Sequence, residues 1–382
     1  MIVELHIIQN FVPSNLNRDD ANAPKDCVFG GYRRARISSQ CIKRSVRKHS
    51  AFYETVQNSG GNIGIRTKRL KSRLVNICQD QGKSQEEAKK AATTIIELLG
   101  LKLSDDEKTE YLLYFGENEV VELATIAINN WELLQKAEKK KDKKDSVAEE
   151  LKDVQKEVGS VVSKNRTDVK SYAADIALFG RMVADRKSIN MNVDAACQVA
   201  HAISTHKVEM EMDYFTAVDD LLPDEDSGSD MIGVVEFNSS CFYRYSLIDI
   251  EKLKKNLGLN SDLLNAAVLG YLEASIKAIP TGKQNSMAAQ NPVSYARLIV
   301  RKGGFPWSLA NAFQKPVTLG RNQSIEESSI AAMKEYFDSL AKIYGIDSII
   351  EDCSFDIHDP ESRSLKELLK SISASLSKEV TA

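Results

Sequence analysis

The order of apolar and polar positions predicts that strands alternate with helices along this chain. Residues 2–12 are rich in β-branched side chains and end at Pro13, which predicts an opening strand. Residues 13–34 are dense in Pro, Asn, Asp and Gly, which predicts a loop. Residues 84–158 hold strong helix formers with apolar positions at helical spacing, so a largely helical insertion is expected there.

The second half of the chain repeats this alternation. Residues 207–233 alternate in polarity and lead to an acidic tip with Pro, Gly and Ser, the pattern of an extended, hairpin-like excursion. The elements predicted after it are a strand at 233–250, a helix at 251–278, a passage from loop to strand at 279–300, and helices near 325–344 and 361–378. Strands scattered between helices, with long inserts, predict an α+β fold in which helices pack on one antiparallel sheet.

The composition is that of an ordinary globular protein. The chain has 382 residues, of which 42% are hydrophobic and 27% are charged, enough for one large domain or two to three smaller ones. No stretch approaches the roughly 18 consecutive apolar residues of a membrane span, and the first residues lack the features of a signal peptide. A cytoplasmic protein is therefore expected. The six cysteines form no Cys-x-x-Cys pair, so they are predicted to be free thiols.

Positive charge is concentrated between residues 30 and 50, which contain seven Lys or Arg side chains although the formal net charge of the chain is -3. No Asp or Glu occurs between Cys27 and Tyr53, so these cations have no acidic neighbours in the sequence. Such local charge predicts one surface that faces a polyanion on an otherwise acidic molecule.

A helix is predicted to begin near Ser38 or Ser39 and to run to about Val56, because either serine can cap the first backbone amides. The helix dipole and the amides at that end favour a phosphate. Basic residues four positions apart are neighbours on this helix, namely Lys43 with Arg47 and Arg44 with Lys48. The positions expected to face a core are Ile42, Val46, His49 and Tyr53. These residue types do not decide between RNA and DNA, since Lys and Arg bind either backbone, and the RRM consensus is not present in the sequence.

Residues 13–48, PSNLNRDDANAPKDCVFGGYRRARISSQCIKRSVRK, resemble the N-terminal signature of the CasC family. Its members are the CRISPR RNA-binding backbone subunits of the type I-E surveillance complex Cascade. The resemblance extends over essentially the full chain, in family order, through GRM (180–182), AHAISTH (200–206), DYFTAVDDL (213–221), FYRY (242–245), NP (291–292) and SLANAF (308–313).

The resemblance implies a right-hand shape with an RRM-like (ferredoxin-like) antiparallel sheet as its palm. The implied boundaries are 1–60, 170–206 and 233–382 for the palm, 61–169 for the helical fingers, and 207–232 for the thumb. It further implies that several copies polymerise along one guide RNA and present it in short segments for pairing with target DNA. The implied partners are guide RNA, target DNA, further copies of the chain and other Cascade subunits, with no membrane, no cofactor and no nuclease activity.

The resemblance also implies site residues. The guide-backbone contacts are Lys25, Ser38, Gln40, Lys43, Arg44 and Arg47, with Lys48 adjacent and Lys283 as a further phosphate contact. The wedge that displaces one nucleotide is Met182 together with Phe215, Thr216 and Val218. A Met thioether and a Phe ring can lie against the face of any base, as a subunit that holds any guide requires. Tyr32 stands where the family commonly has a basic residue, and the Lys-rich segment 136–145 is longer than expected.

Two other functions remain open from the residues alone. A Mg²⁺-dependent nuclease would use the carboxylate pairs Asp19 with Asp20 and Asp219 with Asp220, although such pairs in turn-rich sequence more often act as caps and turn formers. His201 and His206 are five positions apart, which does not suit two zinc ligands on one helix face. The second alternative is a monomeric RNA-binding regulator, which would bind RNA without cooperative growth along it.

Overall fold

The computed structural model describes residues 1–137, 151–162, 173–183, 189–217, 231–320 and 322–380. The chain divides into two compact units. The sheet unit comprises Met1–Phe52, Gln198–Asp249 and Val268–Ala382. The helical unit comprises Tyr53–Cys197 and Ile250–Ala267.

Among the described residues, nine strands form one sheet, with the order β11, β10, β1, β9, β7, β3, β2. β6 and β8 pair with β9 outside this order. The bounds are β1 Ile2–Ser14, β2 Asp26–Phe29, β3 Tyr32–Ile37, β6 Cys197–Val199, β7 Ala202–Ser204, β8 Glu211–Ala217, β9 Met231–Asp249, β10 Tyr295–Arg301 and β11 Ile349–Asp356. β1 pairs antiparallel with both β9 and β10, so the N-terminal strand lies within the sheet rather than at its edge. The predicted α+β fold is confirmed.

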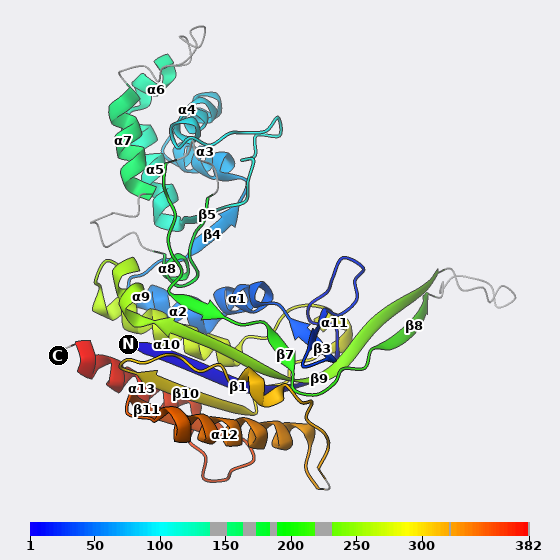
Figure 1. The fold of residues 1–382 in the computed structure, drawn as a ribbon. Coiled ribbons are helices and arrows are strands. Elements are labelled where there is room, and N and C mark those ends of the chain that lie inside the picture. Colours follow the sequence, from blue (N-terminus) through cyan, green and yellow to red (C-terminus); the bar gives the residue numbers. More distant parts are fainter. Residues whose placement is uncertain (138–150, 163–172, 184–188, 218–230, 321, 381–382) are drawn as a thin grey trace, which may run out of the picture. The chain divides into compact units, whose positions relative to one another are not determined.

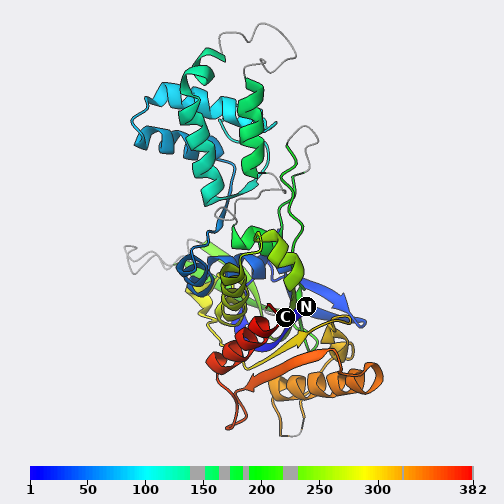
Figure 2. The ribbon, with the colours of Figure 1, turned by 90° about the vertical axis from the view of Figure 1, so that its left-hand side faces the viewer.

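Helices cover both faces of this sheet. In both views α12 (Ile325–Tyr344) lies on one side of the strands, and α1 (Ser39–Lys48) and α10 (Ser261–Lys277) lie on the other (Figures 1 and 2). Side chains alternate along β1, so Ile8 joins the core on the α12 side, while Leu5 and Ile7 line a small cavity with Ile42 of α1 and Tyr271 of α10. The core on the α12 side is aromatic; its largest members are Tyr243, Tyr295, Trp307, Phe313 and Phe337.

A buried polar network fixes the chain that leaves β10. Both Glu4 and Arg301 are at most 1% exposed and form an ion pair through Arg301 Nε. The other carboxylate oxygen of Glu4, Oε2, accepts hydrogen bonds from the backbone N of Trp307 at 2.8 Å and from the hydroxyl of Tyr245 at 3.0 Å. Because these bonds join β1 to β9 and to the end of β10, the network favours this pairing of the strands.

The helical unit is built around its own apolar core, drawn from residues 70–191. Its elements are α3 Leu70–Asp80, α4 Gln85–Leu98, α5 Glu117–Asn129, α6 Trp131–Ala137, α7 Lys152–Val162, α8 Ala174–Phe179 and α9 Ile250–Asn256, with a two-stranded sheet of β4 Gly64–Thr67 and β5 Leu113–Gly116. The prediction of a largely helical 84–158 segment is confirmed for its described part. Of the Lys-rich segment 136–145, only residues 136 and 137 are described, at the end of α6. No helix in the described part of the chain is long and apolar enough to span a membrane.

Several predicted boundaries were wrong. The predicted loop 13–34 contains β2 and the start of β3, a hairpin closed by two glycines with φ of 61° and 83°. The helix predicted from Ser38 to Val56 is two helices, α1 and α2 (Ser50–Asn58), because His49 adopts an extended conformation with ψ of 136°. Likewise, α9 and α10 are separated by Gly258 and Leu259, both with positive φ.

The remaining elements are α11 Gln284–Met287, the short 3-10 helix η4 Leu309–Phe313 and α13 Leu365–Val380. The opening strand, the hairpin of β8 with β9, the strand after it and the two last helices were predicted correctly. The strand β11 was not predicted, since its sequence IIEDCSFD lacks a regular alternation. All six cysteines are free, as expected.

Candidate nucleic-acid interface

The basic segment, residues 33–48, runs from β3 through α1 and contains all seven predicted cations. It begins next to the hairpin turn of Gly30 and Gly31, which the chain can form because both glycines accept positive φ. A Cβ atom at Gly30 would lie 1.9 Å from the backbone oxygen of Gln314, so glycine is also required there by close packing. Asp26, just outside the acid-free stretch, pairs with Arg33 across the hairpin.

Arg34 is a structural residue. Its side chain is 0% exposed, and its guanidinium donates to the backbone oxygens of Ser204 at 3.0 Å, Thr205 at 2.8 Å and Phe313 at 2.7 Å. It therefore joins β3 to β7 and to η4 and is not accessible to a nucleic acid. Arg47, which was predicted to contact the guide, is only 7% exposed, so its side chain packs within the protein rather than on the open face of α1.

The N-terminus of α1 is capped as predicted. Ser38 has the extended conformation of an N-cap, and its Oγ accepts a hydrogen bond from the backbone N of Cys41 at 3.3 Å. Its own backbone N donates to Oδ1 of Asn17 at 2.8 Å, which ties the preceding loop to the helix. No acidic residue occurs in the first turn of α1. The first turn itself therefore contributes no carboxylate to the positive end of the helix dipole.

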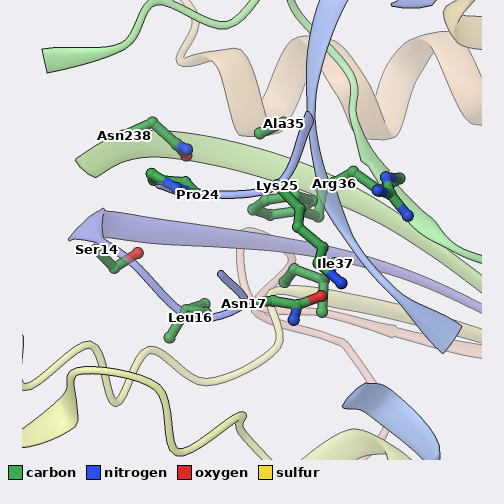
Figure 3. A pocket seen from close by; sticks show the side chains of 10 residues that line it. Ser14, Leu16, Asn17, Pro24, Lys25, Ala35, Arg36, Ile37 and Asn238 are labelled. Atoms are coloured by element: carbon green, nitrogen blue, oxygen red, sulfur yellow. The ribbon is translucent and has the colours of Figure 1, made fainter. Parts of the chain in front are cut away.

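The loop before β2 brings Lys25 to the same place. The backbone N of Lys25 donates to the oxygen of Asn17, and the backbone N of Arg36 donates to the oxygen of Lys25, both at 2.9 Å. Figure 3 shows the pocket that these residues line with Ile37; the Lys25 side chain extends toward the side where Asn17 lies, and Arg36 points away. Burial, and then the nearby cations Arg36 and Lys25, lower the pKa of His201, so its imidazole is neutral at pH 7.

A larger cavity of about 360 Å³ adjoins the exposed side of α1. Arg44, Ser45 and Cys41 line it from the helix, and Arg18 and Asp19 line it from the loop. Burial raises the pKa of the Cys41 thiol, so the thiol adds no negative charge here. Sequence reasoning missed Arg18, although it lies in the family-like segment 13–48, because only the fold brings residue 18 next to residue 44.

Lys283 directly follows a residue that lines this cavity, Gly282. Gly282 lines the cavity, and a Cβ atom at Gly282 would lie 2.3 Å from the backbone oxygen of Leu16, so the two loops are in close contact. Lys283 itself is half-buried, with φ of 50°. The remaining predicted contacts differ in exposure: Gln40, Arg44 and Lys48 are exposed, and Lys43 is half-buried and has an interaction within the protein.

The predicted wedge residues lie in separate parts of the chain. Met182 belongs to the helical unit and is 86% exposed. It follows Arg181, which is buried through an ion pair with Glu119, from Nη1 to Oε2 at 2.6 Å. Phe215 and Thr216 belong to β8 in the sheet unit, and as consecutive strand residues they point to opposite faces of the ribbon. Val218 lies outside the described residues.

The geometry of the carboxylates and histidines is that of turns and structural bonds. Oδ1 of Asp19 accepts hydrogen bonds from the backbone N of Ala21 at 2.9 Å and of Ala23 at 3.0 Å. His206 Nε2 accepts from the backbone N of Cys241 at 3.2 Å. The part of the chain that the structure describes holds no group of three or more His, Cys, Asp or Glu side chains suited to a metal ion. The second carboxylate pair, residues 219 and 220, lies outside the described residues.

Comparison with known proteins agrees with this geometry. The model of a family described as CT1975-like protein matches residues 3–380. A chain of a solved structure named "CRISPR RNA-guided surveillance complex, pre-nicking" is 27% identical, with a TM-score of 0.82 over 98% of this chain and 100% of that chain. A chain of a second structure, named "CRISPR RNA-guided surveillance complex", is 24% identical, with a TM-score of 0.72 over the same shares, which supports the fold. Among curated proteins, none matched the sequence.

Proposed function

The chain belongs to the CT1975-like protein family, and we infer that it is the guide-RNA-binding backbone subunit of a CRISPR RNA-guided surveillance complex. The observation that carries this inference is the match, at 27% identity, to a chain of such a complex over 98% of this chain and 100% of that chain. The subunit is not an enzyme: it holds RNA, and its buried and capped carboxylates serve the fold.

We propose that the guide backbone lies against the N-terminal half of α1. Lys25, Arg44 and the exposed Arg18 supply cations beside the capped helix end, where the backbone amides and the helix dipole favour a phosphate. Gln40, Lys43, Lys48 and Lys283 complete this surface, and the buried Ser38 supports it as the N-cap. Contacts of this kind bind any sequence, because they reach phosphates and not base edges. Arg47 has a supporting role in this proposal, since its side chain is buried.

We further propose that the chain has the hand-shaped organisation of its relatives, with an RRM-like palm at 1–60, 170–206 and 233–382. Residues 61–169 act as fingers and residues 207–232 as a thumb. The ribbon of β8 and β9 supports this role for the thumb, because every residue of β8 is exposed. Met182, Phe215, Thr216 and Val218 act as the wedge that displaces a nucleotide, and the exposure of Met182 and Phe215 supports their part in it.

Several copies then assemble along one guide RNA, and the guide pairs with target DNA while the protein holds the backbone. A native gel with RNAs of increasing length tests this assembly. A ladder that gains one protomer for each fixed increment of RNA length is expected. One shift that is independent of RNA length would instead support a monomeric RNA-binding regulator.

Variants of the proposed surface test whether its side chains bind the RNA in this gel. Arg44→Ala combined with Lys25→Ala is expected to weaken every step of the ladder, with a salt slope lower by roughly 0.7 to 0.9 for each lost phosphate contact. Lys366→Ala combined with Lys370→Ala is the charge-matched control, because both are exposed lysines on α13, away from the proposed surface. An unchanged slope for the double variant would show that these side chains do not meet phosphate.

A further inference from the structure

Gly233 occupies a position where neither the backbone nor strand propensity favours glycine. It lies inside β9, directly opposite Phe215 of β8 in the antiparallel ribbon. Its φ is not positive, unlike that of nine other glycines of the chain, so another residue could adopt its backbone conformation. Glycine inside a strand weakens the strand and often marks a place where another group approaches closely.

The group that approaches Gly233 is the ring of Phe215. A Cβ atom at Gly233 would lie 2.2 Å from Cζ, 2.5 Å from Cε1 and 2.9 Å from Cε2 of that ring. These separations are far shorter than ordinary carbon contacts of about 3.5–4.0 Å. The far end of the ring therefore occupies the space that a side chain at residue 233 would fill. An aromatic ring that covers a cross-strand glycine is a known way to fix such a pair.

On its own face of the ribbon the ring has Asp213, Ala217 and Val235 as described neighbours, because these residues lie two positions away along the two strands. Phe215 is 40% exposed, and its ribbon neighbours on either side, Tyr214 and Thr216, point to the opposite face. The exposed pair Tyr214 and Val234 lies on that opposite face, at 69% and 51% exposure, and cannot touch the ring from there. The space left open above the backbone at residue 233 is therefore one determinant of the orientation of Phe215.

We propose that Gly233 is a positioning residue for the wedge: it holds the Phe215 ring against the ribbon at the angle at which the ring meets the displaced nucleotide. This proposal rests on the proposed function, in which Phe215 belongs to the wedge. It adds a residue that makes no contact with RNA itself and acts through the ring opposite it.

Gly233→Val separates this role from stability. A side chain at residue 233 must displace the ring, and the ring can move because it is the free end of a partly exposed side chain. Valine also has a higher strand propensity than glycine, so the ribbon itself is not weakened. Gly303→Ala is the matched control, since a Cβ atom at Gly303 would have no neighbour within 4 Å and its φ is not positive.

The first measurement uses the full chain without RNA. 4-Fluorophenylalanine at position 215 places fluorine on Cζ, the atom nearest the missing Cβ, and its ¹⁹F NMR signal reports the surroundings of the ring. The signal is expected to shift in Gly233→Val and to stay unchanged in Gly303→Ala. An unchanged signal in Gly233→Val would overturn the proposal, whatever the RNA experiments give.

The second measurement uses guide-length RNAs with 2-aminopurine at successive positions, bound to the full chain. The wild type is expected to give fluorescence maxima at regular intervals, where a base is unstacked. Gly233→Val should reduce these maxima as far as Phe215→Ala does, and the double variant should reduce them no further. Full maxima in Gly233→Val would overturn the proposal. Full maxima in Phe215→Ala would instead overturn the wedge role of Phe215, while the ¹⁹F signal still decides whether Gly233 sets the ring.

Discussion

Replacement of Arg34 by alanine is expected to destabilise the sheet unit without changing the salt dependence of RNA binding. The side chain is 0% exposed, and its two shortest hydrogen bonds are 2.7 Å to the oxygen of Phe313 and 2.8 Å to the oxygen of Thr205. A hydrogen bond to a charged group contributes about 1.5–3 kcal/mol, so the loss of these two lowers the free energy of unfolding by about 3–6 kcal/mol. For a domain of this size the melting temperature then falls by roughly 6 to 24 °C.

Thermal unfolding followed by circular dichroism measures the first effect, and RNA anisotropy titrations between about 50 and 200 mM salt measure the second. Arg33→Ala is the control, because the neighbouring Arg33 is 59% exposed and its ion pair with Asp26 is worth no more than about 1 kcal/mol. Arg44→Ala supplies the opposite result, a lower salt slope at an unchanged melting temperature. The reasoning is refuted if Arg34→Ala melts like the wild type, or if it stays folded but loses salt slope.

Three further perturbations test other parts of the structure. Gly30→Ala should lower the melting temperature by several degrees in a thermal melt, because its Cβ would collide with the backbone oxygen of Gln314 at positive φ; an unchanged melt would contradict the packing. Burial lowers the pKa of His6 to about 3, so the unfolded chain binds more protons and stability should fall as the pH drops from about 6.5 toward 3. His6→Gln should flatten this dependence in urea titrations across that range, and an equal slope would speak against it. Arg181→Ala should leave Glu119 as a buried charge and cost the helical unit about 3–5 kcal/mol; hydrogen exchange that stays as slow as in the wild type would contradict this.

The sequence predicts the elements well where one periodicity covers the whole element. The helix α12 is of this kind and has the predicted bounds, 325–344. The strand β1 was predicted from its β-branched residues and Pro13, and it runs slightly further, to Ser14. The hairpin of β2 and β3 was missed although its two adjacent glycines are a turn signal. The break at His49 has no such signal, since helix formers continue on both sides of it.

The candidate site was predictable as a segment but not residue by residue. The many Lys and Arg residues, with no Asp or Glu among them, show that residues 33–48 are basic, but they do not show which of these side chains are buried. The partners of Arg34 lie 170 to 279 positions away in the sequence, so its structural role exists only in the fold. Arg18 joins the cavity by the same kind of distant contact, from 26 residues before Arg44. Long-range contacts of this kind leave no local sequence pattern from which they could be predicted.

The central place of β1 has a consequence for synthesis of the chain. Ile2 pairs with Asp249 and Arg301, so the first strand leaves the ribosome about 300 residues before its second partner. At about 5–20 residues per second this delay is about 15 to 60 seconds. The contact of Arg34 with Phe313 forms later still, because residue 313 is synthesised after residue 301. A nascent chain therefore exposes an apolar strand and a run of cations together, and a chain cut short before residue 313 carries the basic segment without the scaffold that orients it.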